Sequence, residues 1–177
     1  MQRTDTLILV IDCTSILVTN RTAVMFNIVL YTPQIPQNTG SIARTCAVTG
    51  SALHLIRPYG FIISDKFVRR AGLDYWDDLS IYEYSDFDEF MEKNGDKSIW
   101  LFTSKGQKFY HEASYSDGDF LLFGSETAGV PETVHRAFSG REVKLPMAEG
   151  ERCLNLANCV CAAVYEALRQ TGFKGMV

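Results

Sequence analysis

Three short signatures rich in Gly and Asn occur in a fixed order along this chain, and they constrain its fold more than any other feature. They are residues 36–45 (PQNTGSIART), residues 123–131 (FGSETAGVP) and residues 145–158, which contain LPM and CLNLAN. Each one stands where an apolar, strand-like run gives way to a loop or a helix. In open α/β sheets, ligands bind at the carboxyl ends of the strands. The three segments together therefore predict one ligand site.

Apolar runs and helical periodicity alternate between and around these signatures. The expected strands are Phe26–Tyr31, Ala52–Ile56, Ser80–Tyr84, Ser98–Thr103, Phe120–Phe123 and Glu142–Leu145. The expected helices are Ser41–Thr49, Phe67–Ala71, Phe87–Lys93, Pro131–Ala137 and Asn155–Gln170. Strands that alternate with helices predict an α/β fold, in which a mainly parallel sheet carries helices on both faces.

The length of 177 residues favours a single domain, which we expect at residues 25–177. Residues 1–24 fit poorly with the rest of the chain. Their apolar stretch is too short and too polar for a membrane span. They also lack the basic start and the cleavage site of a signal peptide. Met25 directly precedes a strand-like run, so we expect residues 1–24 to be a leader outside the working domain. The five cysteines have no disulfide or zinc spacing, which indicates reduced thiols in a cytoplasmic protein.

Composition and missing motifs argue against several classes of site. The formal net charge of −4 disfavours a generally basic nucleic-acid binder, although a local basic patch can still bind a phosphate backbone. The chain has neither a dinucleotide-binding glycine motif nor a phosphate-binding Gly-Lys-Ser/Thr. The three histidines lack metal-ligand spacing, and no nucleophile elbow occurs, so we expect neither a metal nor a serine hydrolase.

The first signature admits two interpretations. Residues 38–40 (NTG) precede the first expected helix, where Asn or Thr can cap the free N–H groups. The functional interpretation depends on Arg44, about one turn after Gly40, from which it can point back toward whatever the loop holds. A guanidinium suits phosphate or carboxylate because its planar fork donates two parallel hydrogen bonds. A solvated helix residue is the alternative for Arg44.

The other two signatures also combine a functional and a plain structural interpretation. Gly124 ends a strand and, without a Cβ, would let a ligand approach the backbone closely, whereas the alternative is a simple strand-to-helix turn. Leu145, Met147 and Leu154 would form an apolar wall suited to an uncharged ring such as adenine, with core packing as the alternative. Asn155 predicts a helix cap.

One segment places basic residues beside aromatic ones: Lys66, Arg69 and Arg70, with Tyr75 and Trp76 close behind. Lys105 and Lys108 could extend this cluster. Such a combination suits an RNA backbone with exposed bases. A solvated helix face is the alternative.

Taken together, the signatures resemble the SPOUT superfamily of knotted RNA methyltransferases, and most closely its small tRNA wobble-nucleotide 2′-O-methyltransferase branch. The resemblance runs from Met25 to about Gly175 and includes the stretches NIVLY, IPQNTG, RRAGLDY and VYEA. It implies a C-terminal deep trefoil knot and a homodimer in which the partner chain completes each site. It also implies S-adenosyl-L-methionine as cofactor and methylation of the ribose 2′-hydroxyl of C or U at the wobble position of tRNA.

The resemblance carries over individual site residues. The cofactor contacts it implies are Phe102, Thr103, Gly124, Glu126, Leu145, Met147, Cys153 and Leu154. The RNA contacts it implies are Asn38, Arg44, Lys66, Arg69, Arg70 and Tyr165. Arg44 matches the Arg that the family places near the transferred methyl group. Because a guanidinium barely deprotonates, we expect it to orient a phosphate or the 2′-hydroxyl and to stabilise developing negative charge.

Two departures and two alternatives accompany this assignment. Cys153 stands where the branch commonly has Ser, and Ala128 stands where its closest relatives often have Arg. One alternative is a methyltransferase of the same fold that acts on ribosomal RNA. The other is a non-catalytic RNA-binding or assembly protein that has kept the knot, although the presence of Gly124 and Arg44 disfavours it.

Overall fold

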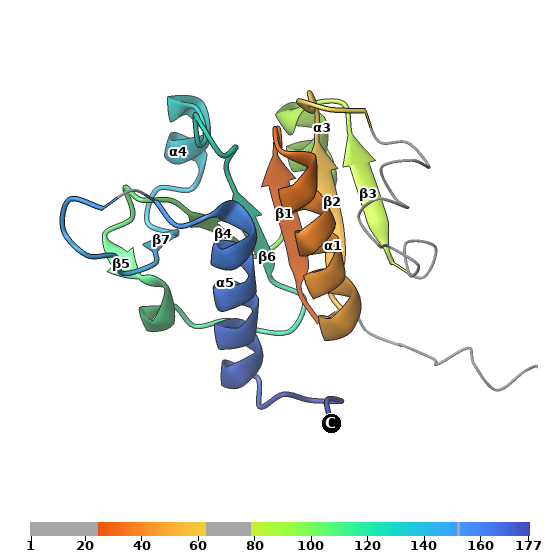
Figure 1. Ribbon diagram of the computed structural model, residues 1–177, viewed down its shortest axis with the longest axis vertical. Helices are drawn as coiled ribbons and strands as arrows, with labels where there is room; N and C mark the ends of the chain where they lie inside the picture. The colour runs from red at the N-terminus through yellow and green to blue at the C-terminus, as the bar shows by residue number, and fades with distance from the viewer. Residues whose placement is uncertain (1–24, 63–78, 152) are drawn as a thin grey trace, which may run out of the picture.

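The computed structural model describes residues 25–62, 79–151 and 153–177. In chain order its elements are β1 (Asn27–Tyr31), α1 (Pro36–Thr49), β2 (Ala52–Ile56), β3 (Ile81–Tyr84), α3 (Phe87–Asn94), β4 (Ile99–Phe102), β5 (Lys108–Phe109), the 3-10 helix η2 (Tyr110–Glu112), β6 (Phe120–Phe123), α4 (Glu132–Ala137), β7 (Glu142–Lys144) and α5 (Leu156–Gln170). Figure 1 shows α1 and α5 side by side in front of the sheet. The expected leader, the helix Phe67–Ala71 and the basic cluster of Lys66, Arg69 and Arg70 lie outside the described residues.

The strands form one seven-stranded sheet in the order β3-β2-β1-β6-β4-β7-β5. Every pairing between the described strands is parallel. The carboxyl ends of all strands therefore lie along the same edge of the sheet. The turns that follow β1, β4, β6 and β7 emerge together at that edge, which brings the three sequence signatures into one region. The expected α/β class with a parallel sheet is confirmed.

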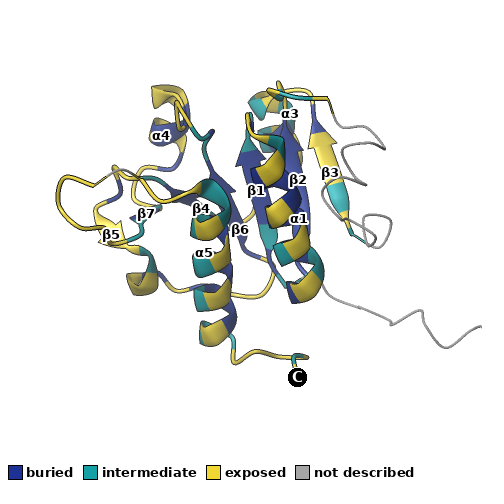
Figure 2. Cartoon of the chain, viewed as in Figure 1, coloured by how far each residue is buried: buried dark blue, intermediate teal, exposed yellow. Residues whose placement is uncertain are grey.

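Alternate residues of the central strands face two separate hydrophobic cores. On β1, Ile28 and Leu30 join a core with residues of α1 and α5, whereas Val29 joins a second core with residues of α3 and α4. Figure 2 shows these central strands as the most deeply buried part of the molecule. Burial on both faces explains why β6 is a continuous apolar run and why β2 is apolar except for His54, rather than alternating. Helices on both faces of the sheet are therefore confirmed.

Helix α1 begins earlier than the sequence predicts. Its N-cap is Ile35, which makes no capping side-chain hydrogen bond, and Pro36 occupies the first turn. Asn38, Thr39 and Gly40 therefore lie inside the helix, where all three are buried. The prediction that these residues cap the helix is wrong. Proline fits the first helical turn because its missing N–H would have no partner there.

The longest expected helix is confirmed with its cap. The Asn155 side chain accepts hydrogen bonds from the backbone N–H groups of Ala157 (2.9 Å) and Asn158 (3.4 Å). Val160, Val164 and other residues of its apolar stripe are buried in the core shared with α1. Sequence reasoning missed β5, whose two residues are too few to show a periodic pattern.

His54 on β2 belongs to a buried polar group within the sheet. Its Nδ1 lies 2.8 Å from the Tyr84 hydroxyl, and its Nε2 lies 3.0 Å from Asn27 Oδ1. Burial lowers the pKa of His54 to about 4.

In the described ranges, no group of three or more His, Cys, Asp or Glu side chains is placed to hold a metal ion. No helix in these ranges has the length and apolarity that crossing a membrane requires.

Candidate functional site

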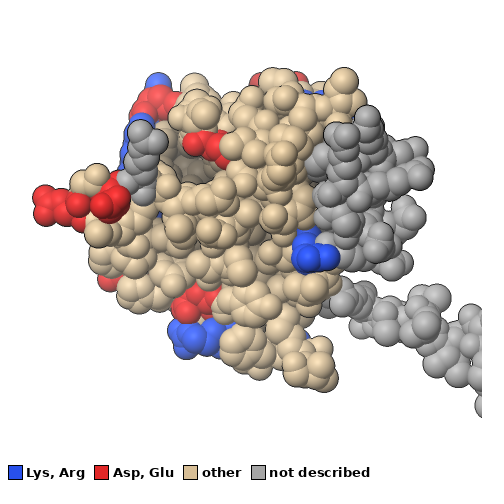
Figure 3. Space-filling view, in the orientation of Figure 1, with Lys and Arg blue, Asp and Glu red and all other residues tan. Residues whose placement is uncertain are grey.

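A pocket of about 430 Å³ opens at the carboxyl edge of the sheet. Figure 3 shows its mouth as a hollow between the parts of the molecule that carry α4 and α5. Its walls are residues 102–105 after β4, residues 123–130 after β6, residues 145, 147 and 153–156 after β7, and Ile35, Asn38, His135 and Cys159. The three signatures, which are far apart in sequence, thus line one cavity. Its volume lies within the range typical of small-molecule sites.

Every residue that the resemblance assigns to the cofactor lines this pocket. They are Phe102, Thr103, Gly124, Glu126, Leu145, Met147, Cys153 and Leu154. The Phe102 and Phe123 rings stack at a centroid distance of 4.6 Å and form one apolar wall. Apolar walls joined to loops with free backbone groups suit an uncharged heterocycle. The geometry brings these residues together, and their contact with a cofactor stays a prediction.

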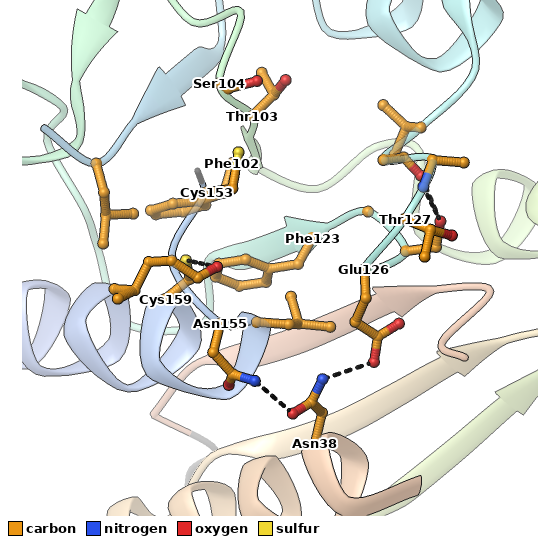
Figure 4. Close-up of a pocket in the computed structure, with 18 of the residues that line it drawn as sticks. Asn38, Phe102, Thr103, Ser104, Phe123, Glu126, Thr127, Cys153, Asn155 and Cys159 are labelled. Carbon is orange, nitrogen blue, oxygen red and sulfur yellow. Dashed lines mark hydrogen bonds between the residues drawn. The ribbon is translucent and has the colours of Figure 1, made fainter. Parts of the chain in front are cut away.

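A chain of side-chain hydrogen bonds connects the three signatures at the floor of the pocket. The Asn155 amide donates to Asn38 Oδ1 at 2.9 Å, and the Asn38 amide donates to Glu126 Oε1 at 2.9 Å. Figure 4 shows the three side chains pointing toward one another from α1, from the turn after β6 and from the start of α5. Asn38 is 6% exposed, and both ends of its buried amide have partners. Its side chain connects α1 to the two loops, and its predicted RNA contact stays a prediction.

The Glu126 carboxylate stabilises the beginning of α1. It accepts hydrogen bonds from the backbone N–H groups of Gln34 (2.8 Å) and Ile35 (3.1 Å), in addition to the one from Asn38. A negative charge is favourable near the positive end of a helix dipole. Glu126 therefore supplies the cap that α1 lacks locally. Sequence reasoning could not find this role, because about ninety residues separate the carboxylate from the helix that it caps.

Gly124 is required by the fold of its own turn, a reason that the sequence does not indicate. A Cβ at this position would lie 2.5 Å from the carbonyl carbon of Gly129, which is far closer than real contacts allow. The backbones of Ser125 and Gly129 bond to each other in both directions at 3.0 Å, so the turn folds back against Gly124. The loop's own closure therefore already excludes a side chain at position 124, and the approach of a ligand to this glycine stays a prediction.

Of the residues predicted to contact RNA, Asn38 lines this pocket, whereas the others that the structure describes do not. Arg44 is exposed on α1 and is not among the lining residues. Tyr165 is 46% exposed on α5 and also lies outside the lining. Lys66, Arg69 and Arg70 lie outside the described residues. Within a single chain, the structure therefore brings the predicted cofactor contacts together and leaves Arg44 and Tyr165 outside the pocket, while all of these contacts stay predictions.

Two thiols, of Cys153 and Cys159, and the imidazole of His135 lie in the pocket wall, and sequence reasoning did not predict that they would share one site. The Cys159 thiol donates to the Leu154 carbonyl at 3.5 Å, and burial together with the neighbouring Cys153 raises the pKa of Cys159. His135 lies 2.6 Å from Glu142 through its Nδ1. Cys153 itself is exposed at the pocket, at the position where the SPOUT branch commonly has Ser.

Comparison with known proteins decides the family. The sequence profile described as the SpoU rRNA Methylase family matches residues 25–165. The chain belongs to this family. A curated protein of Saccharophagus degradans named tRNA (cytidine(34)-2′-O)-methyltransferase is 46% identical to it over 152 residues, which cover 85% of this chain and 99% of that protein. The resemblance inferred from the signatures is thereby confirmed for this SpoU-family protein.

Solved structures agree in fold. A structure described as giving structural insights into the 2-OH methylation of C/U34 on tRNA superposes with a TM-score of 0.78 at 42% identity, and the match covers 85% of this chain and 98% of that one. The SpoU methyltransferase AviRb from Streptomyces viridochromogenes, in complex with the cofactor AdoMet, superposes with a TM-score of 0.69 at 27% identity. That match covers 82% of this chain and 57% of AviRb.

Proposed function

We propose that this SpoU-family protein transfers a methyl group from S-adenosyl-L-methionine to the ribose 2′-hydroxyl of the wobble nucleotide, C or U, in tRNA. Two observations carry the proposal. The three signatures that define the resemblance line a single pocket, and the chain matches nearly the full length of a relative named for this activity. The family's own description refers to ribosomal RNA, which makes that RNA the alternative substrate.

The pocket fits the adenosine part of the cofactor in size and chemistry. Phe102, Leu145 and Leu154 offer apolar surface to a purine, while the loops at Gly124 and Met147 bring backbone groups to its rim. When bound, the cofactor supplies a methyl group already activated by the positive sulfonium. The task left to the protein is to align the 2′-hydroxyl with that methyl group and to ease removal of its proton.

Arg44 is the proposed catalytic residue. A new O–CH3 bond forms as the S–CH3 bond breaks, and the hydroxyl proton leaves to a substrate phosphate or to water. A guanidinium can orient that phosphate or the 2′-hydroxyl and stabilise the negative charge that develops on oxygen. Because Arg44 lies outside the pocket of its own chain, we propose that it serves the site of a partner chain across a dimer interface.

The proposed homodimer packs through the face that α1 and α5 share. It is supported by Val48 on α1, which is 62% exposed, and Tyr165 on α5, which is 46% exposed, because an exposed apolar face is typical of an interface. Light scattering at micromolar concentration is expected to give twice the chain mass. A monomer that methylates tRNA at the same concentration would contradict the shared site.

Two further parts of the proposal follow from the family. The C-terminal knot is supported by the place of β7 between β4 and β5, from which the chain returns to pack α5 against α1. The cytoplasmic location is supported by the free thiols of Cys46, Cys153, Cys159 and Cys161.

The test is to map ribose 2′-O-methyl groups in tRNA and ribosomal RNA from cells with and without the protein. We expect the modification at the wobble nucleotide of particular tRNAs to disappear and to return when the purified protein and S-adenosylmethionine are added. Loss of a ribosomal RNA methyl group, with unchanged tRNA, would establish the alternative substrate. Unchanged methylation of both RNAs would favour a non-catalytic role.

A further inference from the structure

The charged groups around the pocket are few. Of the lining residues that the structure describes, Lys105 is the only lysine or arginine, and Glu126 is the only acid. The Glu126 carboxylate already accepts three hydrogen bonds from α1 and the residues before it. A negatively charged group entering the pocket would therefore find one full positive charge among these residues, on Lys105.

The backbone at Lys105 is held firmly at the rim. Thr103 donates its N–H to Val143 on β7 at 2.9 Å, and Gly106 closes the turn by donating to the Thr103 carbonyl at 3.2 Å. The Lys105 N–H lies 3.3 Å from the Thr103 hydroxyl, which accepts from it. A Cβ at Gly106 would lie 2.7 Å from the Val143 carbonyl carbon, so this turn sits directly against β7. Lys105 thus extends from a fixed point.

The turn lies opposite the carboxylate. Figure 4 shows Thr103 and Ser104, which directly precede Lys105, across the cavity from Glu126. The Lys105 ammonium lies 3.8 Å from Glu132, and the two side chains are 66% and 65% exposed. An exposed pair of this kind is weak, so the lysine can exchange Glu132 for another anion at little cost.

We propose that Lys105 binds the carboxylate of the cofactor's amino-acid part, and so makes the pocket prefer ligands that carry it. This inference rests on the proposed function. S-adenosylmethionine and S-adenosylhomocysteine have an uncharged adenine at one end and a carboxylate with an ammonium at the other. The apolar walls suit the first end, and the lysine suits the second. Lys105 is then a specificity residue for the cofactor rather than a member of the RNA-binding cluster.

The experiment is calorimetry with two ligands on three proteins. S-adenosylhomocysteine carries the carboxylate, whereas 5′-methylthioadenosine keeps the adenosine and the thioether but lacks the amino-acid part. We expect Lys105→Met to weaken S-adenosylhomocysteine about five- to tenfold and to leave 5′-methylthioadenosine unchanged. Lys108→Met is the matched control, because Lys108 is an exposed lysine three residues further on that does not line the pocket. Its two affinities should equal those of the wild type.

A second variant tests the competition with Glu132. Glu132→Gln removes the anion that holds Lys105 in the free protein, so it should strengthen S-adenosylhomocysteine up to about threefold. Equal weakening of both ligands by Lys105→Met, or no weakening of either, would overturn the inference. A loss confined to tRNA affinity would also overturn the inference, because Lys105 would then be an RNA contact. If the wild type binds neither ligand, it is the proposed function that fails.

Discussion

Replacing Glu126 should destabilise the protein as well as its pocket. Glu126→Ala removes the acceptor of three hydrogen bonds, two of them from backbone groups before α1 and one from the buried Asn38 amide. Hydrogen bonds to a charged group each contribute about 1.5–3 kcal/mol, but water can replace the carboxylate at the two exposed backbone donors. We therefore expect a loss of about 2–4 kcal/mol in the free energy of unfolding. For a chain of this size, that lowers Tm by roughly 4–16 °C.

Circular dichroism melting measures this loss, and calorimetry with S-adenosylhomocysteine on the same samples separates stability from binding. Glu126→Gln should fall between wild type and Glu126→Ala, because an amide oxygen can still accept but carries no charge. Asp96→Ala is the control, since its 71%-exposed carboxylate has one surface ion pair, with Lys97, and does not line the pocket. A Glu126→Ala protein that melts like the wild type and yet binds no ligand would refute our account. Glu126 would then be a ligand contact and not the cap of α1.

Three further results are expected. Arg44→Ala should lower the rate of methyl transfer at saturating tRNA by a factor of roughly 10²–10³ and leave S-adenosylhomocysteine affinity within a few-fold of the wild type. Arg44→Lys should restore little of that rate, because an ammonium lacks the planar fork of a guanidinium. Near-normal turnover in Arg44→Ala would make Arg44 a structural residue. The folded pKa of His54, about 4, lies below its unfolded value of 6.5, so the unfolded chain binds the proton first as the pH falls. Urea denaturation should show about 2 kcal/mol of stability lost between pH 6.5 and 5, whereas a flat profile would contradict the burial of a neutral ring. Deleting residues 1–24 should leave Tm and methylation nearly unchanged, and a large drop in either would show the leader to be part of the domain.

The strands and the ligand loops were predictable because their signals are local. An apolar run such as Phe120–Phe123 that ends in Gly124 can be recognised without any knowledge of its neighbours. Parallel pairing then places its carboxyl end at the same edge as those of the other strands, so the three signatures could be expected to meet there. The individual residues of the pocket were assigned from the family resemblance.

What the sequence could not provide are contacts between distant segments. The start of α1 was misplaced because Asn38 looks like a local cap, whereas the actual cap is the carboxylate of Glu126 from another loop. One constraint on position 124 is the backbone of Gly129, which approaches it only after the turn has closed. The distance of Arg44 from its own chain's pocket likewise depends on how α1 is oriented on the sheet.

The hydrogen-bond chain from Asn155 through Asn38 to Glu126 also has a direction. A carboxylate can only accept hydrogen bonds, so the NH2 group of Asn38 must face Glu126. The Asn38 Oδ1 then faces the other way and accepts a hydrogen bond from the Asn155 amide. A carboxyl group at position 38, as in Asn38→Asp, would replace the amide that lies 2.9 Å from Glu126, and two such groups cannot both stay ionised. The link between α1 and the loop after β6 would then depend on one shared proton, so a bond that is insensitive to pH in this protein would become sensitive to it.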